Sequence, residues 1–457
     1  MVKYKAYPEY KDSGVEWLGT IPTSWQIWKL SHAYEVIGSG TTPTSDNESY
    51  FQGDIPWVTT GELREKIIYD TGKKVNESTL KIFSALKIHP AGSVVIAMYG
   101  ATIGRLGILG VDATTNQACC VMTKSKIINN QYLYYWLQAY RTDIIRLSSG
   151  GGQPNINQEK VSSLKVSAPA LNDQSLIVAF LDRETAKIDN LIEKQQQLIE
   201  LLKEKRQAVI SHTVTKGLNP DVPMKDSGVE WLGDVPEHWE LVPLKYLCNF
   251  SGGGTPTKDN LSYWLGGTVP WVSPKDMKSF WISETQDYVT PKAVSESSTN
   301  YVEEGSLLMV VRSGILQRNI PVAINIVKVT MNQDMKALRF NERMEAHYAA
   351  YFINGNVNSL LLEWTKEGAT VESIEHEYLA NGLLPVPPID EQYLIIKSIS
   401  DQMIRFELLE EKALTGIRLL QERRTALISA AVTGKIDVRD WVAPDSQDIE
   451  ASQEAIA

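Results

Sequence analysis

Hydrophobic and polar residues follow two different patterns along this chain, and the first pattern gives way to the second twice. Over residues 1–168 and 223–386, short apolar runs alternate with stretches rich in Gly, Pro and Thr, as in a compact domain of mixed strands and helices. The clearest predicted elements are buried strands at 94–99 and 307–311 and aromatic-rich helices at 132–147 and 348–364. Because strands and helices do not alternate regularly, the pattern favours an α+β class over a doubly wound sheet.

The second pattern is found in two long stretches, residues 173–216 and 391–433, which contain no Pro and a single Gly, Gly416. Asn172 and Asp390 stand directly before them, where helix N-caps belong. At 1.5 Å per residue, each helix would be about 60 Å long. Most a and d positions of a seven-residue repeat are apolar, as a two-helix coiled coil requires; they include Leu181, Ile188, Leu191, Leu198 and Leu202, then Ile399, Phe406, Leu409, Ala413 and Leu420.

We expect these two helices to pack antiparallel on each other and to hold the globular parts apart. Packing of each helix against a domain core is the alternative, although about 40 residues is long for such a helix.

The sequence also contains an internal duplication. Lys11–Gly19 recurs without change as Lys225–Gly233, an offset of 214 residues, and chance does not produce nine identical residues that include Trp. The offset then drifts only between 213 and 218 over the further matches, which are Gly40–Thr44 with Gly253–Thr257, Ile55–Val58 with Val269–Val272, Gly92–Ile96 with Gly305–Met309, Asn116–Gln117 with Asn332–Gln333, and Lys205–Ser211 with Arg423–Ser429.

Two similar halves fold most simply around a pseudo-twofold axis, and twofold proteins suit duplex DNA. A duplicated scaffold that binds no nucleic acid is the alternative. The predicted organisation is two similar mixed α/β globular domains and two long antiparallel coiled-coil helices, with the following boundaries: a first domain at 1–168, a first helix at 169–222, a second domain at 223–386, a second helix at 387–435, and an acidic tail at 436–457.

The charge is divided unevenly between the halves. The 457-residue chain has a net charge of −10, but residues 23–168 hold 14 Lys and Arg against 11 Asp and Glu, whereas residues 223–386 hold 13 against 20. A local basic face can still meet phosphate in an acidic protein. The modest positive charge nevertheless predicts that this chain alone neutralises few phosphates.

Several classes of protein are disfavoured by what the sequence lacks. No apolar stretch reaches 18 residues and no signal-peptide run opens the chain, so we expect no membrane span and a cytoplasmic location. Cys119, Cys120 and Cys248 form no C-x-x-C pair and are expected to be buried and reduced, the first two on opposite faces of a strand. No P-loop, H-E-x-x-H, G-x-S-x-G or Asp/Asn-Pro-Pro-aromatic motif occurs, so we expect a protein that is not an enzyme.

Each half resembles the methylase-S target recognition domain of Type I restriction–modification specificity subunits. The resemblance extends from about Lys11 to Gly434, and its strength lies in the order of the motifs, repeated twice and followed each time by a long helix. The motifs are the Gly-Thr-Pro turns and Pro-Trp-Val strands matched above, Tyr99–Gly104, Gly151–Ile156, and the Pro-x-x-[Asp/Glu]-Gln-x-x-Ile entry to each long helix.

The resemblance implies a non-catalytic subunit whose two domains each read one half-site of double-stranded DNA, while the paired helices set the spacer. It further implies that two methyltransferase (M) subunits dock on the chain and that restriction (R) subunits join through them. S-adenosylmethionine, ATP and magnesium would belong to those partners, so no cofactor is expected in this chain. A duplicated coiled-coil adaptor for proteins, or the recognition half of a methyltransferase that acts alone, are the competing interpretations.

The expected DNA contacts follow from which side chains read base edges and which loops approach phosphate. We predict Arg105, Gln153 and Asn155 in the first domain. In the second domain, residues 312–318 replace the Tyr99–Arg105 motif and residues 367–372 replace the glycine-rich loop, and we predict Arg312, Gln317 and Arg318. The repeated tryptophan pairs, Trp17 with Trp231 and Trp57 with Trp271, are expected in the core, because contact residues should differ between halves that read different sequences.

Overall fold

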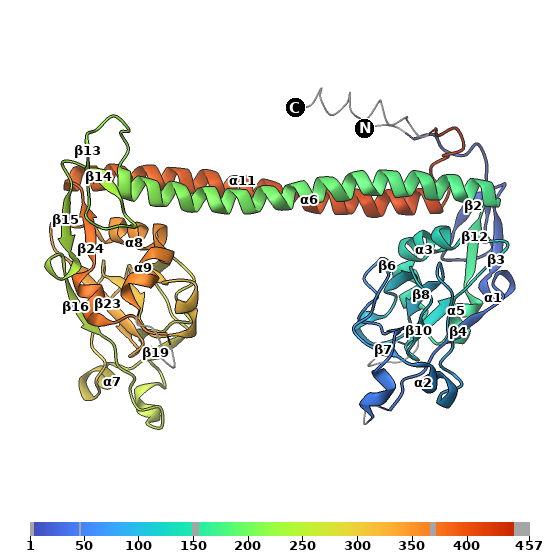
Figure 1. The fold of residues 1–457 in the computed structure, drawn as a ribbon, viewed down its shortest axis with the longest axis horizontal. Coiled ribbons are helices and arrows are strands. Elements are labelled where there is room, and N and C mark those ends of the chain that lie inside the picture. The colour runs from blue at the N-terminus through green and yellow to red at the C-terminus, as the bar shows by residue number, and fades with distance from the viewer. Residues whose placement is uncertain (1–3, 45–46, 149–154, 366–371, 443–457) are drawn as a thin grey trace. The chain divides into compact units, whose positions relative to one another are not determined.

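The computed structural model divides the chain into two compact units. The first unit contains Met1–Gln195 and Thr415–Ala457, and the second contains Gln196–Leu414. Each unit therefore combines one globular lobe with the beginning of one long helix and the end of the other (Figure 1). The structure describes residues 4–44, 47–148, 155–365 and 372–442.

The lobe of the first unit is built on a five-stranded sheet with the order β4-β11-β8-β9-β6 and a three-stranded sheet with the order β10-β5-β7. Two antiparallel pairs, β1-β2 and β12-β3, complete it. The strands are β1 (Tyr10–Asp12), β2 (Thr20–Pro22), β3 (Gln26–Lys29), β4 (Ile37–Ser39), β5 (Ile55–Val58), β6 (Lys66–Ile68), β7 (Lys74–Val75), β8 (Val94–Ala97), β9 (Leu106–Leu109), β10 (Thr114–Thr115), β11 (Cys119–Met122) and β12 (Lys165–Ala168).

The lobe of the second unit repeats this topology strand for strand. Its sheets have the orders β16-β23-β20-β21-β18 and β19-β17-β22, with the pairs β13-β14 and β15-β24. The duplication seen in the sequence is therefore a duplication of the fold. The strands are β13 (Met224–Asp226), β14 (Asp234–Pro236), β15 (Glu240–Pro243), β16 (Cys248–Gly252), β17 (Val269–Val272), β18 (Trp281–Ile282), β19 (Asp287–Val289), β20 (Leu307–Val310), β21 (Val322–Asn325), β22 (Thr330–Met331), β23 (Met335–Phe340) and β24 (Leu383–Val386).

The helices also correspond between the units, with α1 matched by a 3-10 helix at Leu244–Tyr246. Two long helices, α6 (Leu171–Lys216) and α11 (Ile389–Val432), occupy the two stretches that the heptad pattern predicted. The shorter helices are α1 (Leu30–Ala33), α2 (Glu77–Ile82), α3 (Asn130–Ala139), α4 (Arg141–Arg146), α5 (Gln158–Ser163), α7 (Pro291–Glu296), α8 (Ala346–Gly355), α9 (Val357–Trp364) and α10 (His376–Asn381). Among the described residues, no helix is both long and apolar enough to cross a membrane.

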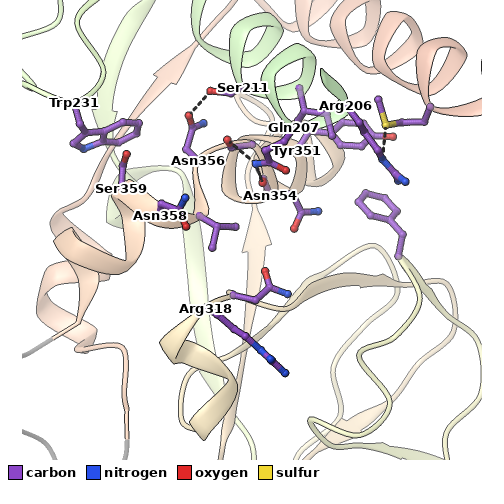
Figure 2. Close-up of a pocket in the computed structure, with 16 residues that line it drawn as sticks. Arg206, Gln207, Ser211, Trp231, Arg318, Tyr351, Asn354, Asn356, Asn358 and Ser359 are labelled. Carbon is purple, nitrogen blue, oxygen red and sulfur yellow. Dashed lines mark hydrogen bonds between the residues drawn. The ribbon is translucent and has the colours of Figure 1, made fainter. Parts of the chain in front are cut away.

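Each aromatic-rich segment that the sequence predicted as one helix is two helices, so that prediction was wrong. The breaks fall at Tyr140 in the first unit and at Asn356 in the second. Asn356 competes with the helix for hydrogen bonds, because its Nδ2 donates to the Phe352 carbonyl oxygen at 2.8 Å and its Oδ1 accepts from Ser211 Oγ at 2.8 Å (Figure 2). A Cβ on Gly355 would stand 3.0 Å from the Ser211 backbone, so α8 lies directly against α6 at this break.

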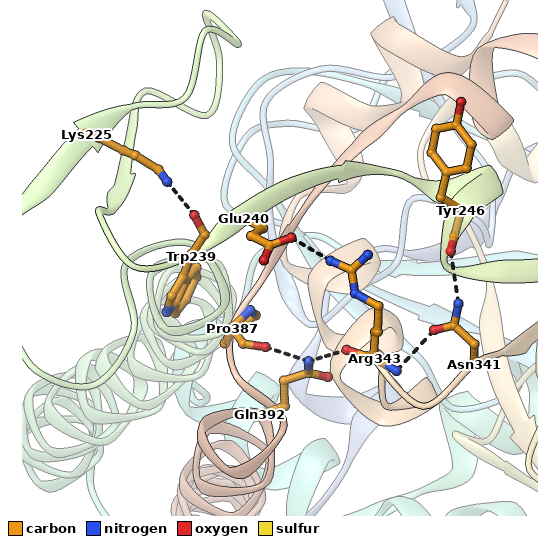
Figure 3. Close-up of polar contacts among 8 residues, drawn as sticks. All are labelled: Lys225, Trp239, Glu240, Tyr246, Asn341, Arg343, Pro387 and Gln392. Carbon is orange, nitrogen blue, oxygen red and sulfur yellow. Dashed lines mark hydrogen bonds and ion pairs between the residues drawn. The ribbon is translucent and has the colours of Figure 1, made fainter.

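A buried glutamine ties the start of α11 to the lobe of the second unit. Gln392 is fully buried, and its Nε2 donates to the carbonyl oxygens of Arg343 and Pro387, each at 2.8 Å (Figure 3). Its Oε1 accepts from the Glu345 N–H at 2.9 Å. One side chain thus satisfies three backbone groups at the junction between the helix and the domain.

Gln174 makes the same three bonds at the start of α6 in the first unit. It accepts from the Asn129 N–H at 2.7 Å and donates to the carbonyl oxygens of Ile127 and Pro169, each at 2.9 Å. These glutamines belong to the Pro-x-x-[Asp/Glu]-Gln motif, so the motif has a structural role in joining each lobe to its own helix.

The expected N-caps of the long helices were misplaced by two residues. The α6 and α11 helices begin at Leu171 and Ile389, so Asn172 and Asp390 lie inside the first turn rather than before it. The sequence signal was ambiguous because Asn and Asp are favoured both at the cap and in the first turn of a helix.

Replacing Gln392 by Leu is expected to lower the free energy of unfolding of the second unit by about 3 kcal/mol or more, because three buried backbone groups lose their partner. Gln421→Leu is the matched control, since Gln421 is an exposed glutamine of the same helix. Thermal unfolding of the full-length chain measures both. Equal melting temperatures for the two variants would show that the buried bonds contribute no net stability.

The end of each long helix packs on the lobe where the other long helix begins. In the first unit, Tyr132 in α3 donates to the Val432 carbonyl oxygen near the end of α11 at 3.4 Å. In the second unit, Tyr348 in α8 donates to the Val214 carbonyl oxygen near the end of α6 at 2.8 Å. Both tyrosines are fully buried, so each lobe is held by segments of both helices.

Contacts between the two long helices are found inside each unit. In the first, Arg424 in α11 pairs with Asp189 in α6 at 2.8 Å. In the second, Arg206 in α6 lies 3.9 Å from Glu407 in α11. In the first unit, a Cβ on Gly416 in α11 would also stand 4.0 Å from Gln195 Oε1 in α6. This contact lies further along α6 and earlier along α11 than the Arg424–Asp189 pair, so the two segments run antiparallel in that unit.

The adjacent cysteines lie on opposite faces of the five-stranded sheet, as expected. Cys119 and Cys120 in β11 are both fully buried, but they belong to different hydrophobic clusters of the first unit. Cys248 is buried in the second unit, and all three are free thiols. Burial raises the pKa of the Cys120 thiol to about 12, so it stays protonated at neutral pH.

The repeated tryptophans differ in how deeply their side chains are buried. Trp57 and Trp271 are buried, which confirms their assignment to the core. Trp17 and Trp231 are only half-buried, although both pack against the hydrophobic core of their lobe. The outer edge of Trp231 is tied by a bond from Nε1 to the Glu363 carboxylate at 2.8 Å.

Candidate nucleic-acid interface

The Gly-Thr-Pro turn of the first lobe is anchored to the sheets by backbone contacts. A Cβ on Gly40 would overlap the Thr115 carbonyl oxygen, so only Gly fits there. The buried Trp57 donates from Nε1 to the Thr41 carbonyl oxygen at 3.2 Å. The second lobe repeats both contacts, with Gly253 against Asn332 and with Trp271 Nε1 donating to the Gly254 carbonyl oxygen at 3.1 Å. These repeated motifs therefore hold the scaffold that carries the variable loops.

The structure brings two predicted residues of the first lobe to the end of strand β8. The Arg105 carbonyl oxygen accepts from the Ala97 N–H at 2.9 Å, which places Arg105 on the side of β9. Asn155 pairs with Tyr99 in an isolated antiparallel bridge on the other side. Arg105 and Asn155 thus flank one strand end. Gln153, the third predicted residue, lies outside the described residues.

The loop between β8 and β9 is shaped by glycines. Gly104 has a φ of +73°, a conformation that side-chain-bearing residues rarely adopt. A Cβ there would also come within 3.2 Å of side-chain atoms of Arg141 and Ile145 in α4. The loop therefore lies directly on α4, and the chain leaves it at Arg105.

The corresponding loop of the second lobe is three residues longer, which changes what Arg318 corresponds to. Arg312 takes the position of Tyr99, because it forms the equivalent bridge, to Ser373. The loop between β20 and β21 is then closed by a hydrogen bond from the Val310 N–H to the Pro321 carbonyl oxygen at 3.0 Å. Pro321, and not Arg318, is thus the positional equivalent of Arg105 in the first lobe. Arg318 lies in the extra turn instead.

The candidate side chains are accessible. Asn155, Arg312, Gln317 and Arg318 are exposed, and Arg105 is partly exposed. Within the described part of the chain, none of the five forms a side-chain hydrogen bond or an ion pair with another residue. Guanidinium and amide groups of this kind are the usual readers of guanine and adenine edges.

Sequence reasoning missed Ser373, which occupies the position of Asn155 in the second lobe. The loops before them differ too much to be aligned. A signal was present, because Gln174 and Gln392 differ by 218 residues, and the same offset relates Asn155 to Ser373. The following isoleucines confirm this register, since Ile156 and Ile374 are both buried.

No group of three or more His, Cys, Asp and Glu residues in the described ranges is placed to hold a metal ion. What the two lobes present is therefore a pair of similar sheet ends, each carrying accessible polar side chains that differ between the lobes.

Comparison with known proteins agrees with this picture. Residues 22–201 and 236–417 match the family model of the Type I restriction modification DNA specificity domain. The Type I restriction enzyme MjaIX specificity subunit of Methanocaldococcus jannaschii is 28% identical over 458 residues, which cover 96% of this chain and 99% of that protein. The EcoR124I/EcoR124II specificity subunit of Escherichia coli is 30% identical over 275 residues, which cover 58% of this chain and 61% of that protein.

Two solved structures share the fold. The HsdS subunit from Thermoanaerobacter tengcongensis superimposes with a TM-score of 0.56 at 15% identity, over 91% of this chain and 98% of that one. A chain from a structure on complex assembly and conformational transition of the type I R-M system gives a TM-score of 0.64 at 16% identity, over 91% and 99%.

Proposed function

Because the chain belongs to the family of Type I restriction–modification DNA specificity domains, we propose that it is the specificity subunit that reads a two-part DNA target, one half-site with each lobe. The main support for this proposal is that the two lobes share one scaffold but differ in their loops. Both lobes have the same strand order, whereas the loops after β8 and β20 differ in length and in residues. A duplicated scaffold with different loops is what two different half-sites require.

The relatives named above are specificity subunits of Type I restriction enzymes. We infer that this chain is likewise non-catalytic and that the chemistry of its complex resides in methyltransferase and restriction subunits. S-adenosylmethionine, ATP and magnesium would accordingly bind those partners. The predicted contacts of this chain with double-stranded DNA are Arg105, Gln153 and Asn155 for one half-site and Arg312, Gln317 and Arg318 for the other. A subunit with this role would act in the cytoplasm.

The long helices would act as an antiparallel coiled coil that spaces the lobes around a pseudo-twofold axis. Support comes from the contacts between the two helices within each unit, Arg424 with Asp189 and Arg206 with Glu407. It also comes from the predicted a positions of the seven-residue repeat, of which Leu181, Ile188, Ile399 and Ala413 are buried. Since the lobes are joined to the helices through buried residues such as Gln174 and Gln392, the helix length would set the unspecified spacer of the target.

The same helices offer surface for two methyltransferase subunits, through which restriction subunits would join. Exposed apolar side chains are numerous on them, and such side chains in number mark interaction surfaces. In the first unit they include Leu171, Leu191 and Leu419, and in the second they include Leu198, Leu201, Leu394, Ile404, Leu408, Leu409 and Leu414. Leu191, Leu198 and Leu409 were predicted at apolar positions between the helices, and their exposure corrects that prediction.

The isolated chain is expected to bind DNA weakly, and the methyltransferase subunits should strengthen specific binding by orders of magnitude. The reason is charge, because the second lobe is acidic and few phosphates can be neutralised without a partner. Gel-shift titrations at fixed salt, with and without the partners, measure this. Nanomolar specific binding by the chain alone would refute the charge argument. Failure of the complete complex to prefer any sequence would refute the proposed function.

A further inference from the structure

A polar pocket of about 670 Å³ lies in the second unit, between the end of α6, the break between α8 and α9, and the loop after β20 (Figure 2). Arg206 comes from α6, Asn354 and Asn358 from the α8–α9 region, and Arg318 from the loop. None of its sixteen described lining residues is Asp or Glu. Residues 223–386 hold 20 acidic against 13 basic residues, so a lining without carboxylates is unusual for this part of the chain.

The two arginines have little to bind inside the protein. Arg206 Nε donates at 3.1 Å to the sulfur of Met403, a weak acceptor, and the nearest carboxylate, of Glu407, is 3.9 Å away. Arg318 is exposed and has no side-chain hydrogen bond among the described residues. Both guanidinium groups therefore have donors left for a ligand, and they point in different directions (Figure 2).

Amide side chains that line the pocket beside the arginines are held in place by hydrogen bonds. Gln207 Nε2 donates to the carbonyl oxygens of Asn354 and Gly355 at 2.6 and 2.9 Å. Asn356 is held by Ser211, as described above. Arg, Asn, Gln, Ser and Tyr side chains together make up the usual set that contacts phosphate oxygens in protein–DNA complexes.

The corresponding place in the first unit is closed to anions. Arg424, which matches Arg206 in the repeat, donates to Asp189 at 2.8 Å. Asp182 accepts from Tyr135 Oη at 2.6 Å, and Glu65 also lines the pocket, which is only about 250 Å³. Its lining thus contains three carboxylates where the second unit has none.

We propose that the pocket of the second unit binds the DNA backbone next to the second half-site, with Arg206 and Arg318 donating to different phosphate groups. This rests on the proposed function and adds to it a contact that fixes register without reading bases. DNA is favoured over a free nucleotide because the rim residues Arg318, Asn319 and Asn358 are exposed, so a phosphate within a continuous strand can enter. The loop of Arg318 also carries Arg312, a predicted base contact.

The test uses the full-length chain in complex with its methyltransferase subunits and duplexes that carry the target. Arg206→Ala should weaken binding roughly tenfold for all sequences alike, and the slope of log K against log salt should become shallower by about 1. Arg206→Lys should restore the slope, since it keeps the charge. Arg424→Ala, the matched control, should leave the slope unchanged, because Arg424 is already paired with Asp189.

Replacing single phosphates by neutral methylphosphonates locates the contact. At one position near the second half-site, the replacement should weaken the wild type roughly tenfold and leave Arg206→Ala unaffected. An unchanged salt slope for Arg206→Ala would overturn the proposal. So would thermal stabilisation by a nucleoside monophosphate that depends on Arg206 without any effect on DNA binding, which would indicate a free nucleotide. Loss of the methyltransferase subunits from Arg206→Ala would instead indicate an acidic protein segment. If the wild-type complex itself shows no sequence preference, the proposed function fails, independently of the pocket.

Discussion

Duplicating one heptad in each long helix, residues 196–202 in α6 and 408–414 in α11, is expected to lengthen the spacer of the DNA target by about three base pairs. Seven residues add about 10 Å of helix, and base pairs of B-form DNA are 3.4 Å apart. A whole heptad keeps the apolar positions of both helices on the same face, so their pairing survives. Mapping of methylated adenines in cells that express the variant would show the two half-sites unchanged and the gap between them longer.

The control for this change is the same duplication in α6 alone. It leaves seven residues of one helix without a partner in the other, so methylation should be lost or strongly reduced rather than shifted to a new spacing. An unchanged spacer in the double duplication would mean that the helices do not measure the distance between half-sites.

Replacing Arg312 and Gln317 together by Ala is expected to lower discrimination at the second half-site by roughly 100-fold or more, because each good base contact contributes about 1–3 kcal/mol. The first half-site should be read as before. The measurement is binding of the methyltransferase complex to duplexes with single base changes in either half-site.

Two variants control for general effects of losing side chains. Arg339→Ala removes an exposed arginine of β23, on the same sheet as the loop, and should leave recognition unchanged. Arg105→Ala with Asn155→Ala should have the reciprocal effect, on the first half-site alone. If the Arg312 and Gln317 variant keeps its target preference, these side chains do not read bases.

The sequence was sufficient to predict features that depend on repetition and periodicity. The nine-residue repeat implied two similar folds, and the strand orders of the two lobes agree element by element. The long helices start and end within a few residues of the prediction, because a stretch without Pro leaves few other options. Cys119 and Cys120 face opposite sides of β11, as strand geometry requires.

What the sequence did not give depends on tertiary contacts. The break at Asn356 arises from its bonds to Ser211 and Phe352, and one of these partners lies 145 residues away. The three extra residues before Pro321 are not visible from Arg105 and Arg318, which suggested an alignment without a gap. Ser373 was missed because its loop does not align with the first copy, and the bridge to Arg312 shows its position directly. The position of Arg206 in the pocket could not be predicted, because the pocket is formed by α6, α11 and the second lobe together.

Single-molecule sequencing of methylated adenines in the host genome, with and without this gene, shows whether the chain specifies a two-part DNA target. With the gene present, we expect a methylated motif made of two short specified parts and a gap of fixed length, and this motif should disappear when the gene is deleted. A methylation pattern that is the same in both strains, or a lost motif that is continuous, would contradict it.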